Sequence, residues 1–424
     1  MSNDLKFNVI LDGAYPYVPH ASERASNYID LPNKHYDPVL GQHILEDQLE
    51  TLAQLERFGF DGAVVSEQHN GPIGLHGNPM LAGAWLAART TKINVVINGP
   101  IMNRYSSPVR LAEEIAVLDT MSRGRLVLGL PMGHGMQYHS MGDVSPATAR
   151  ARYREAHDLL VKALTEDGPF EWRGEFYNIP YVNLWPKPLH MPEIIIPGGG
   201  SVETLELVAK HRYGYQGILT PRASALKNLQ KLRDLCEAEG YELERRQVSQ
   251  YVSIHVAETD EQARREIETH ELWSYQNFFR SPNYDNFPPG YVTVNSMRGM
   301  LSGGGYRSTP MEEMSLNQIE ENHWAIFGSP ATVADKLRAS VDELGAGAIT
   351  LVGNFGTKPR WLTEKSLSMF AEEVIPKFRS EEGKGSAPGY STLAEYGARR
   401  PREFTRPTIV VNGERRAVQD GLPA

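Results

Sequence analysis

The sequence lacks the features that mark several large classes of protein. Its 424 residues include a single cysteine, Cys236, so no intrachain disulfide can form. Cys236 lies in a helical pattern, LQKLRDLCEAE, where we expect a packed side chain rather than a nucleophile. No apolar run approaches membrane-spanning length, and MSNDLKFNVI has no basic stretch followed by an apolar one, so we expect no secretory signal. A formal charge of −9 argues against a nucleic-acid binder. These absences together fit a cytoplasmic protein.

Motifs for metals and nucleotides are missing as well. None of the 13 histidines forms an HxH pair and no HExxH occurs, so we predict no metal site. In GHGMQY, residues 133–138, Tyr138 stands where a dinucleotide-binding GxGxxG has its last glycine. PGGGS, residues 197–201, lacks the lysine of a P-loop, which argues against a nucleoside triphosphate.

Short β-rich runs alternate with stretches of helical period along most of the chain. The predicted strands are 7–12, 62–66, 93–99, 125–130, 193–197, 217–220, 248–255 and 348–352. The predicted helices are 39–58, 80–89, 109–121, 147–165, 202–210, 223–239, 260–275 and 331–343. Several strands are apolar without alternation, as strands covered on both faces are. Eight strand–helix pairs indicate an α/β protein with a (β/α)8 TIM barrel. A doubly wound open sheet is the alternative, because strand order cannot be read from sequence.

Three segments exceed such a barrel. Residues 167–192 are too rich in proline and glycine to be helical. Residues 277–325 contain several aromatic side chains and a flexible SGGG, and we interpret them as an insertion that forms a lid. We predict one domain over residues 1–380, followed by a C-terminal extension, residues 381–424. A VVNG hairpin signal occurs in this extension, which is either an oligomerisation arm or a frayed end.

The second strand ends abruptly in three polar residues, Glu67, Gln68 and His69. Functional groups of a TIM barrel lie at the carboxyl ends of its strands. Imidazole titrates near neutral pH, so His69 is the best candidate for a general base or hydrogen-bond donor. Glu67 either orients this imidazole or is a buried structural acid. We take all three as candidate catalytic residues. The alternative is that they only cap the strand and anchor the loop that follows it.

The next two strand ends allow a flat ligand to approach the backbone. Asn98 offers an amide, and it is followed by Gly99–Pro100, an X–Pro bond that can adopt the cis form. After the fourth strand come Gly133 and Tyr138 within a glycine-rich stretch. Each is a candidate ligand contact, and an ordinary strand-ending turn is the alternative for each.

The fifth strand runs into three glycines and a serine that precede a helix. Backbone N–H groups at Gly199, Gly200 and Ser201 and the helix dipole would point to one spot, which favours an anion. Ser201 and Thr204 add hydroxyls within reach of a phosphate. A capping turn without a ligand is the alternative.

The order of these motifs resembles that of the bacterial luciferase-like family of flavin-dependent monooxygenases. The matching stretches are FGFDGAVVSEQH, GNPMLAGAWLAARTTKINV, SSPVRLAEEIAVLDTMSRGRLVLGL, FEWRGEFYNIP with NLWPKPL, PGGGSVETLELVAKH and GSPATVADKLRASVDELGAGAITL. They cover most of residues 7–260 and 326–380, in family order. The resemblance implies an interrupted eight-stranded barrel that binds reduced FMN at the carboxyl ends of its strands.

Carried over to this sequence, the resemblance assigns roles to residues already noted. The catalytic first histidine of the family's EHH is replaced by Gln68, which leaves His69 as the remaining imidazole. The family's cis peptide beneath the flavin ring corresponds to Gly99–Pro100. Its phosphate-binding arginine is replaced by Met132, so another group must neutralise the phosphate. Its phosphate loop corresponds to Gly199, Gly200, Ser201 and Thr204.

These observations together predict a two-component FMN-dependent monooxygenase. Reduced FMN from a separate flavin reductase and O2 would oxygenate a small, apolar or aromatic organic substrate. The expected cofactor contacts are Asn98, Gly99, Pro100, Met132, Gly133, Tyr138, Gly199, Gly200, Ser201 and Thr204. We further expect a homo-oligomer, either a dimer or a tetramer. The alternatives are a deazaflavin-dependent oxidoreductase on the same fold and a non-catalytic flavin-binding subunit.

Overall fold

The computed structural model describes residues 4–12, 14–23, 26, 31–133, 137–138, 144–279, 288, 290–294, 311–380, 408–411 and 414–417. Eight parallel strands form its centre. They are β1 (Lys6–Leu11), β2 (Gly62–Ser66), β3 (Asn94–Asn98), β4 (Leu126–Gly129), β7 (Glu193–Gly198), β8 (Gly214–Gly217), β9 (Val248–Val256) and β11 (Ala348–Asn354). Their order is β9-β11-β1-β2-β3-β4-β7-β8, and β8 pairs again with β9. The sheet is therefore closed, which confirms the TIM barrel and makes the open-sheet alternative wrong.

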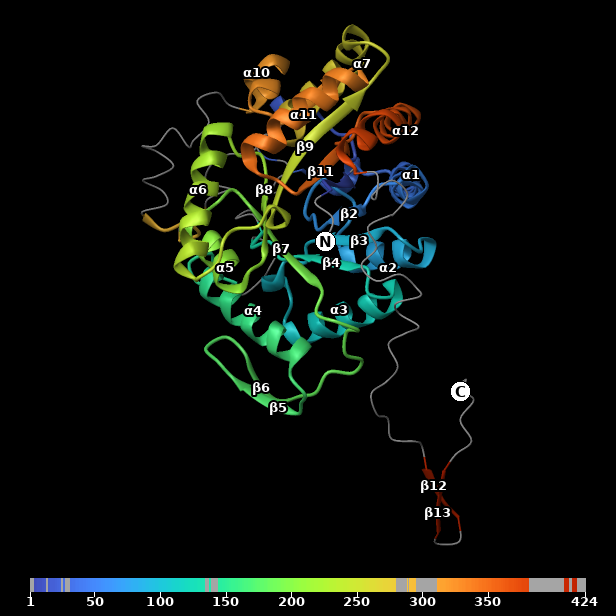
Figure 1. Cartoon of the computed structure of the whole chain (residues 1–424). Helices are drawn as coiled ribbons and strands as arrows, with labels where there is room; N and C mark the ends of the chain where they lie inside the picture. Colours follow the sequence, from blue (N-terminus) through green and yellow to red (C-terminus); the bar gives the residue numbers. More distant parts are fainter. Residues whose placement is uncertain are drawn as a thin grey trace. The chain divides into compact units, whose positions relative to one another are not determined.

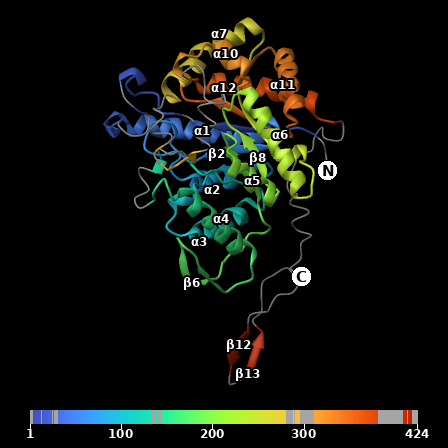
Figure 2. The same cartoon turned by 90° about the vertical axis from the view of Figure 1, so that its left-hand side faces the viewer.

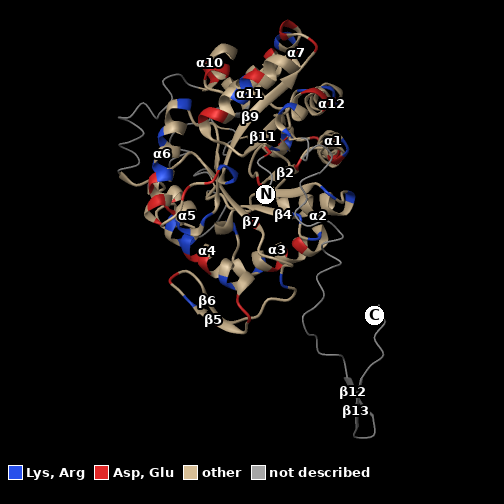
Figure 3. Cartoon of the chain, in the orientation of Figure 1, with Lys and Arg blue, Asp and Glu red and all other residues tan. Residues whose placement is uncertain are grey.

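Helices follow one another around these strands in chain order (Figure 1). They are α1 (Pro38–Phe58), α2 (Pro79–Arg89), α3 (Pro108–Ser122), α4 (Ala149–Thr165), α5 (Val202–His211), α6 (Arg222–Ala238), α7 (Asp260–Trp273), α11 (Pro330–Leu344) and α12 (Arg360–Met369). Charged residues of both signs are scattered along these outer helices, whereas the central strands carry few (Figure 3). Among the described helices, none combines the length and the apolarity needed to cross a membrane.

Helix starts follow from local capping chemistry. Asp37 accepts hydrogen bonds from the amides of residues 39 and 40, and Pro38 occupies the first turn of α1. The pairs Asn78–Pro79, Ser107–Pro108 and Ser329–Pro330 begin α2, α3 and α11 in the same way. Each capped helix covers the outside of the barrel, where its apolar face joins one large buried cluster between strands and helices.

The inside of the barrel is filled by a second, smaller cluster. It consists of Ile10, Val64, Val96, Val127 and Val352, each from a different strand. The register aligns them, since Ile10 pairs with both Val64 and Val352, and Val96 pairs with both Val64 and Val127. The barrel centre is thus solid, and a ligand has room only above or below this layer.

Two predicted element boundaries are wrong. The strand predicted at 217–220 is β8, Gly214–Gly217, because the polar Gln216 points into the barrel and hid the strand pattern. The helix predicted at 260–275 ends as α7 at Trp273 and continues as one π-helical turn, Ser274–Phe278.

Several elements were not predicted. Within 167–192, β5 (Phe170–Arg173) and β6 (Asn178–Val182) form an antiparallel hairpin outside α3 and α4 (Figure 2). The described end of the 277–325 insertion contains α10 (Leu316–Glu321), and β10 (Ala325–Gly328) then pairs with the last residues of β9. Helix α12 was also missed. A capping box between Ser315 and Gln318 starts α10, so this part is not a loop.

The chain separates into two compact units, residues 1–390 and 391–424. In the second unit, β12 (Thr408–Val411) and β13 (Glu414–Ala417) pair as an antiparallel hairpin in which Val411 faces Glu414. The hairpin predicted from VVNG is therefore confirmed. Its role as an oligomerisation arm stays a prediction.

Candidate active site

The polar residues after β2 form a tight pair at the carboxyl end of the barrel. The Nε2 atom of His69 lies 2.5 Å from Oε1 of Glu67, whose side chain is almost fully buried. The other carboxylate oxygen of Glu67 accepts a hydrogen bond of 2.9 Å from the amide of Ile101. The Nε atom of Arg104 lies 3.6 Å from Oε1. Glu67 therefore orients the imidazole and also fastens the turn after β3.

Gln68 points away from this pair into a second network. Its Nε2 donates to Oγ of Ser66 at 3.2 Å, and this hydroxyl lies 2.7 Å from both carboxylate oxygens of Asp12. Asp12 directly follows β1. Burial raises the pKa of its carboxyl to about 6, although the hydrogen bonds from Ser66 oppose the rise. Sequence analysis missed Asp12, whose only signal was its place after an apolar strand.

Asn98 is held inside the mouth of the barrel by side chains from two distant strands. Its Nδ2 donates to Oε1 of Gln216 at 3.1 Å and to the hydroxyl of Tyr251. Gln216 in turn donates to Oγ1 of Thr350 at 2.9 Å. The Oδ1 atom of Asn98 is buried against Gly129 of the neighbouring strand and has no hydrogen-bond donor among the described residues. Asn98 thus lies directly above the apolar layer, tied to two other strands through its Nδ2.

The turn after Asn98 is packed against β2. The Gly99–Pro100 peptide bond is cis, as the resemblance implied. A Cβ atom on Gly99 would lie 2.8 Å from Cβ of Glu67, so only glycine fits at this position. This contact places the turn beside the Glu67–His69 pair.

Beyond β4, two backbone carbonyl groups accept hydrogen bonds from tyrosines. The hydroxyl of Tyr138 donates to the carbonyl of Met132 at 2.7 Å, and Tyr291 donates to that of Gly133 at 2.5 Å. The two rings lie 5.7 Å apart. Tyr291 belongs to the 277–325 insertion, so a described part of that insertion lies against the end of β4. The neighbouring His134 and His139 fall outside the described residues.

The glycine-rich loop before α5 is open on one side. A Cβ atom on Gly199 would meet nothing within 4 Å, whereas one on Gly200 would lie 2.0 Å from Nδ2 of Asn228. Asn228 donates to the carbonyl of Gly199 at 3.0 Å and fixes the loop. Ser201 caps α5 by accepting from the amide of Thr204, and the two hydroxyls lie 2.9 Å apart.

A positively charged side chain, that of Arg150, lies beside the first turn of α5. The Nη1 atom of Arg150, from α4, lies 3.7 Å from Oε2 of Glu203. Its Nε donates to the carbonyl of Tyr291 at 3.2 Å. Sequence analysis left the phosphate-neutralising group unnamed, and Arg150 gave no motif by which it could be found.

His76, in the loop after β2, is a second imidazole near the site. It is only 3% exposed, and no described residue hydrogen-bonds to either of its ring nitrogens. Burial lowers its pKa to about 4, so the ring is neutral at physiological pH. Its carbonyl accepts from the amide of Gln68 at 3.2 Å, which ties it to the end of β2.

An apolar cluster lies close to the same strand ends. It contains Ala14, Ile73, Trp273, Phe279 and Phe355, and Phe355 also contacts the apolar layer inside the barrel. The rings of Phe279 and Phe355 meet edge to face at 5.1 Å. The site thus combines polar groups on one set of strands with an apolar surface on another.

The structure does not join all of the predicted site residues directly. Glu67 and His69 form one group, Gln68 belongs to the Asp12 network, and Asn98 belongs to the Gln216 network. Across the described residues, no hydrogen bond links any of these to the loop 199–204. What the groups share is the carboxyl end of the barrel.

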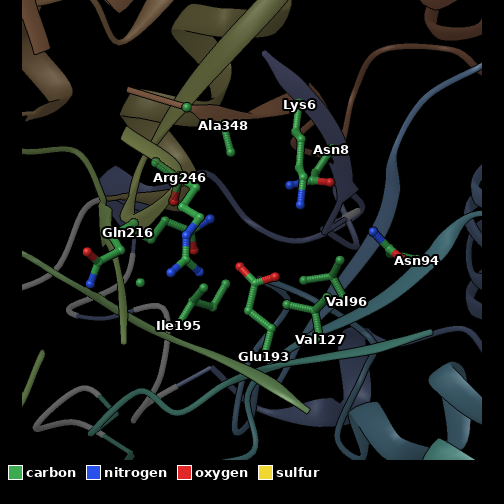
Figure 4. A pocket seen from close by; sticks show the side chains of 14 residues that line it. Lys6, Asn8, Asn94, Val96, Val127, Glu193, Ile195, Gln216, Arg246 and Ala348 are labelled. Atoms are coloured by element: carbon green, nitrogen blue, oxygen red, sulfur yellow. The ribbon is translucent and has the colours of Figure 1, made fainter. Parts of the chain in front are cut away.

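A polar cavity occupies the opposite end (Figure 4). Figure 4 shows the side chains of Lys6, Glu193 and Arg246 directed into it, with Asn8 and Asn94 beside them. Lys6, Asn94 and Glu193 are the first residues of their strands. Barrel enzymes act at the carboxyl ends of the strands, so we do not place the active site here.

Comparison with known proteins agrees with this architecture. A sequence model described as luciferase-like monooxygenase matches residues 29–347. The chain is 23% identical over 346 residues to limonene 1,2-monooxygenase of Rhodococcus erythropolis, covering 80% of this chain and 83% of that protein. It is 24% identical to 4-hydroxyprotoasukamycin monooxygenase of Streptomyces nodosus subsp. asukaensis, covering 82% and 90%.

Solved structures share the fold. The oxygenating constituent of 3,6-diketocamphane monooxygenase of Pseudomonas putida, in complex with FMN, superimposes with a TM-score of 0.65 at 19% identity, covering 88% of this chain and 99% of that one. The coenzyme F420-dependent tetrahydromethanopterin reductase of Methanopyrus kandleri gives 0.59 at 19% identity, covering 89% and 100%. The family match spans most of the chain and includes all of the site residues predicted from the sequence, from Glu67 to Thr204. This confirms the resemblance seen in the sequence, and the chain belongs to the luciferase-like monooxygenase family.

Proposed function

We propose that this protein is a two-component FMN-dependent monooxygenase that oxygenates a small, apolar or aromatic organic compound. It would receive reduced FMN from a separate flavin reductase and use O2 as the co-substrate. The observation that carries the proposal is the loop before α5, where an open Gly199 precedes a capped helix at the carboxyl end of the barrel. Reduced FMN, when bound, supplies the electrons with which one atom of O2 enters the substrate and the other becomes water.

The loop fits the phosphate of FMN. Side chains are absent at Gly199 and Gly200, so an anion can approach the backbone amides that precede α5. Ser201 and Thr204 add hydroxyl donors, and the positive end of the helix dipole faces the same place. Arg150 supplies a positive charge beside the first turn, in place of the arginine that Met132 replaces.

The ring of the flavin would lie over the turn after β3. Asn98 ends β3 just before this turn, and its Oδ1 has no donor in the described part of the chain, so a small rotation of the amide would let it accept from an N–H group of the flavin. At Gly99–Pro100 the absence of a side chain on Gly99 lets the turn pack against Glu67, which places the cis peptide beside the Glu67–His69 pair. Met132 and Gly133 lie on the neighbouring strand end, where Tyr138 and Tyr291 hold their carbonyl groups in place.

His69 is the group that would hold or move a proton. The Nε2 atom of His69 is hydrogen-bonded to Glu67, whereas Nδ1 of His69 makes no hydrogen bond to the part of the chain that the structure describes. With Nε2–H donating to the carboxylate, Nδ1 carries the lone pair that can accept a proton from a ligand. Glu67 acts through His69 and is a positioning residue.

The apolar cluster around Phe355 supports an apolar or aromatic substrate. The rings of Phe279 and Phe355 carry no hydrogen-bonding group, and Trp273 offers only its indole N–H, so a largely hydrocarbon surface packs best against this cluster. Two of the proteins named above are a limonene 1,2-monooxygenase and a 3,6-diketocamphane monooxygenase. Residues 280–287 and 295–310 fall outside the described part of the chain, so the predicted lid stays a proposal.

A reductase-coupled assay tests the proposal. Purified protein, NADH, a general flavin reductase and FMN are combined with a panel that includes a cyclic terpene and a cyclic ketone, and oxygenated products are measured by mass spectrometry with ¹⁸O2. We expect label in a product, and a loss of about 100-fold or more for His69→Ala. His43→Ala, an exposed histidine on α1, is the matched control. Full activity in His69→Ala would remove His69 from the mechanism.

A deazaflavin-dependent oxidoreductase is the second candidate, favoured by the shared barrel of the F420-dependent reductase. Anaerobic titration separates the two: binding of reduced coenzyme F420 but not of reduced FMN would support this candidate and contradict the proposal. If FMN binds and no panel compound is oxygenated, the replacement of the first histidine by Gln68 would favour a non-catalytic flavin-binding subunit.

A further inference from the structure

A cluster of metal-ligating side chains lies on the outer helices, away from the mouth of the barrel. It consists of His157 and Asp158 from α4 and His211, the last residue of α5. One nitrogen or oxygen from each residue lies within 4.8 Å of the others. Because 53 and 54 positions separate His211 from the other two residues, no sequence motif reveals the cluster.

His157 is the fixed member of this cluster. Its side chain is 1% exposed, and its Nε2 lies 2.9 Å from the hydroxyl of Tyr213. This contact leaves Nδ1 facing the carboxylate of Asp158, with 3.0 Å between Nδ1 and Oδ1. The ring of His211 meets that of His157 at 4.8 Å and stacks on Tyr213 at 5.2 Å. Tyr213 therefore holds both imidazoles.

This arrangement has two features of a metal site. A four-coordinate Zn²⁺ lies about 2.0–2.2 Å from its nitrogen and oxygen ligands, which places those ligands roughly 3.3–3.6 Å from one another. The Nδ1–Oδ1 separation is already close to that value, and the more exposed Asp158 and His211 can close the remaining gap. In addition, a ligating histidine characteristically donates its second N–H to a fixed oxygen, which the Tyr213 hydroxyl provides for His157.

Some of the charges near the cluster favour a bound cation and others oppose it. Lys210 opposes a cation, whereas Asp158 and the C-terminal end of the α5 dipole favour one.

We propose that His157, Asp158 and His211 bind one divalent transition-metal ion of the Zn²⁺, Ni²⁺ or Cu²⁺ type, with water as the remaining ligand. These metals suit imidazole ligands. The ion would join α4 to the carboxyl end of α5, the helix whose other end carries the loop 199–201. Without an ion, the same groups satisfy one another, since Nδ1–H donates to Asp158 and the Tyr213 hydroxyl donates to Nε2.

The test uses the full-length chain without a histidine tag, stripped of metal with a chelator and titrated with ZnCl2 by calorimetry. We expect one equivalent to bind and the melting temperature to rise with Zn²⁺ concentration. His211→Gln and Asp158→Asn should each weaken binding at least tenfold. Both side chains are more exposed than His157, so the variants are expected to fold, and unchanged melting without Zn²⁺ verifies this.

His43→Gln, an exposed histidine on α1, is the control for non-specific binding. Binding by the unmodified protein that is no tighter than by His211→Gln would overturn the proposal. So would a loss in His43→Gln equal to the loss in His211→Gln. Tyr213→Phe adds an independent measure: it should weaken Zn²⁺ several-fold, because Nε2–H of His157 loses its acceptor.

Discussion

Replacement of Asp12 by asparagine should stabilise the protein at neutral and alkaline pH and have much less benefit in acid. Asp12 is buried at the end of β1, and its carboxyl has a pKa of about 6 in the folded protein against an ordinary value of 3.8. Ser66 donates to it through its hydroxyl and its backbone amide, and these hydrogen bonds do not fully offset the effect of burial. The ionised form is therefore costly to keep inside the fold.

The sign follows from the raised pKa. Below about pH 4 the carboxyl is protonated in both the folded and the unfolded chain, so no penalty exists. As the pH rises from 4 to 6, the unfolded chain loses this proton first, and the free energy of unfolding falls. Above pH 6 the full penalty remains. A pKa difference of about 2 corresponds to about 3 kcal/mol at roughly 1.4 kcal/mol per pH unit.

The same magnitude can be expressed as a melting temperature. The unfolding entropy of about 2.1 cal/mol/K per residue gives about 0.8 kcal/mol/K for roughly 380 residues, so 3 kcal/mol corresponds to about 4 K. The asparagine amide also introduces N–H groups that need acceptors, at a cost of about 1–2 kcal/mol that does not vary with pH. The test therefore uses the way the difference in melting temperature between variant and native protein changes with pH. The size of that difference at any one pH does not decide it.

Scanning calorimetry of the native protein and of Asp12→Asn at half-unit steps from pH 4 to pH 8.5 measures this change. We expect the melting temperature of the variant, relative to the native protein, to rise by about 4 K between pH 4 and pH 7 and then to level off. Asp335→Asn, which removes an exposed carboxylate on α11, should show no such rise. A flat difference for Asp12→Asn would refute the assignment of a buried, titrating carboxylate.

Two further variants test the surroundings of the site, and a third tests a contact at the amino ends of the strands, where Glu56 accepts from the amides that precede β3. Arg150→Gln should weaken FMN binding about tenfold in an equilibrium titration, because the phosphate loses the cation beside α5. Gly200→Ala should lower the free energy of unfolding by about 1–3 kcal/mol in denaturant titrations. The backbone φ of Gly200 is +85°, and the new Cβ would lie 2.0 Å from Nδ2 of Asn228. Gly199→Ala is the control, because a Cβ on Gly199 meets no described atom within 4 Å. Glu56→Gln should cost about 1–2 kcal/mol at pH 7, with a smaller effect in acid. Burial raises the pKa of this carboxyl, but the amides of residues 91–93 outweigh burial and lower it overall, so its contribution is lost as the pH falls.

The strands and helices were predictable where one local signal determined them. Strands such as 62–66 and 348–352 are covered on both faces, and this shows as unbroken apolar runs in the sequence. Where a helix begins with a capping residue followed by proline, these two residues predict where the helix starts. The prediction failed for β8, because Gln216 is polar and yet points into the barrel, where Asn98 and Thr350 satisfy it.

The candidate site was predictable only in its local parts. Glu67 and His69 are two residues apart, so the short stretch SEQH reveals their contact. Asn98, by contrast, bonds to Gln216 and Tyr251, which are 118 and 153 positions away. Such partners are brought together by closure of the barrel, and no spacing in the chain encodes them. Arg150 could not be found for the same reason.

Unpaired polar atoms connect the architecture with a ligand at this end of the barrel. Within the described part of the chain, Oδ1 of Asn98, Oε1 of Gln68 and both ring nitrogens of His76 are buried and have no hydrogen-bond partner. A buried polar group left unpaired costs about 1–3 kcal/mol, so these three residues weaken the unliganded fold by several kcal/mol. Asn98 ends β3, and Gln68 and His76 lie in the chain that follows β2. If a flat ligand with several N–H and C=O groups reaches these atoms, as we propose for the flavin, it would remove part of this cost, whereas a hydrocarbon alone would not. The apolar cluster around Phe355 would then be left for the substrate.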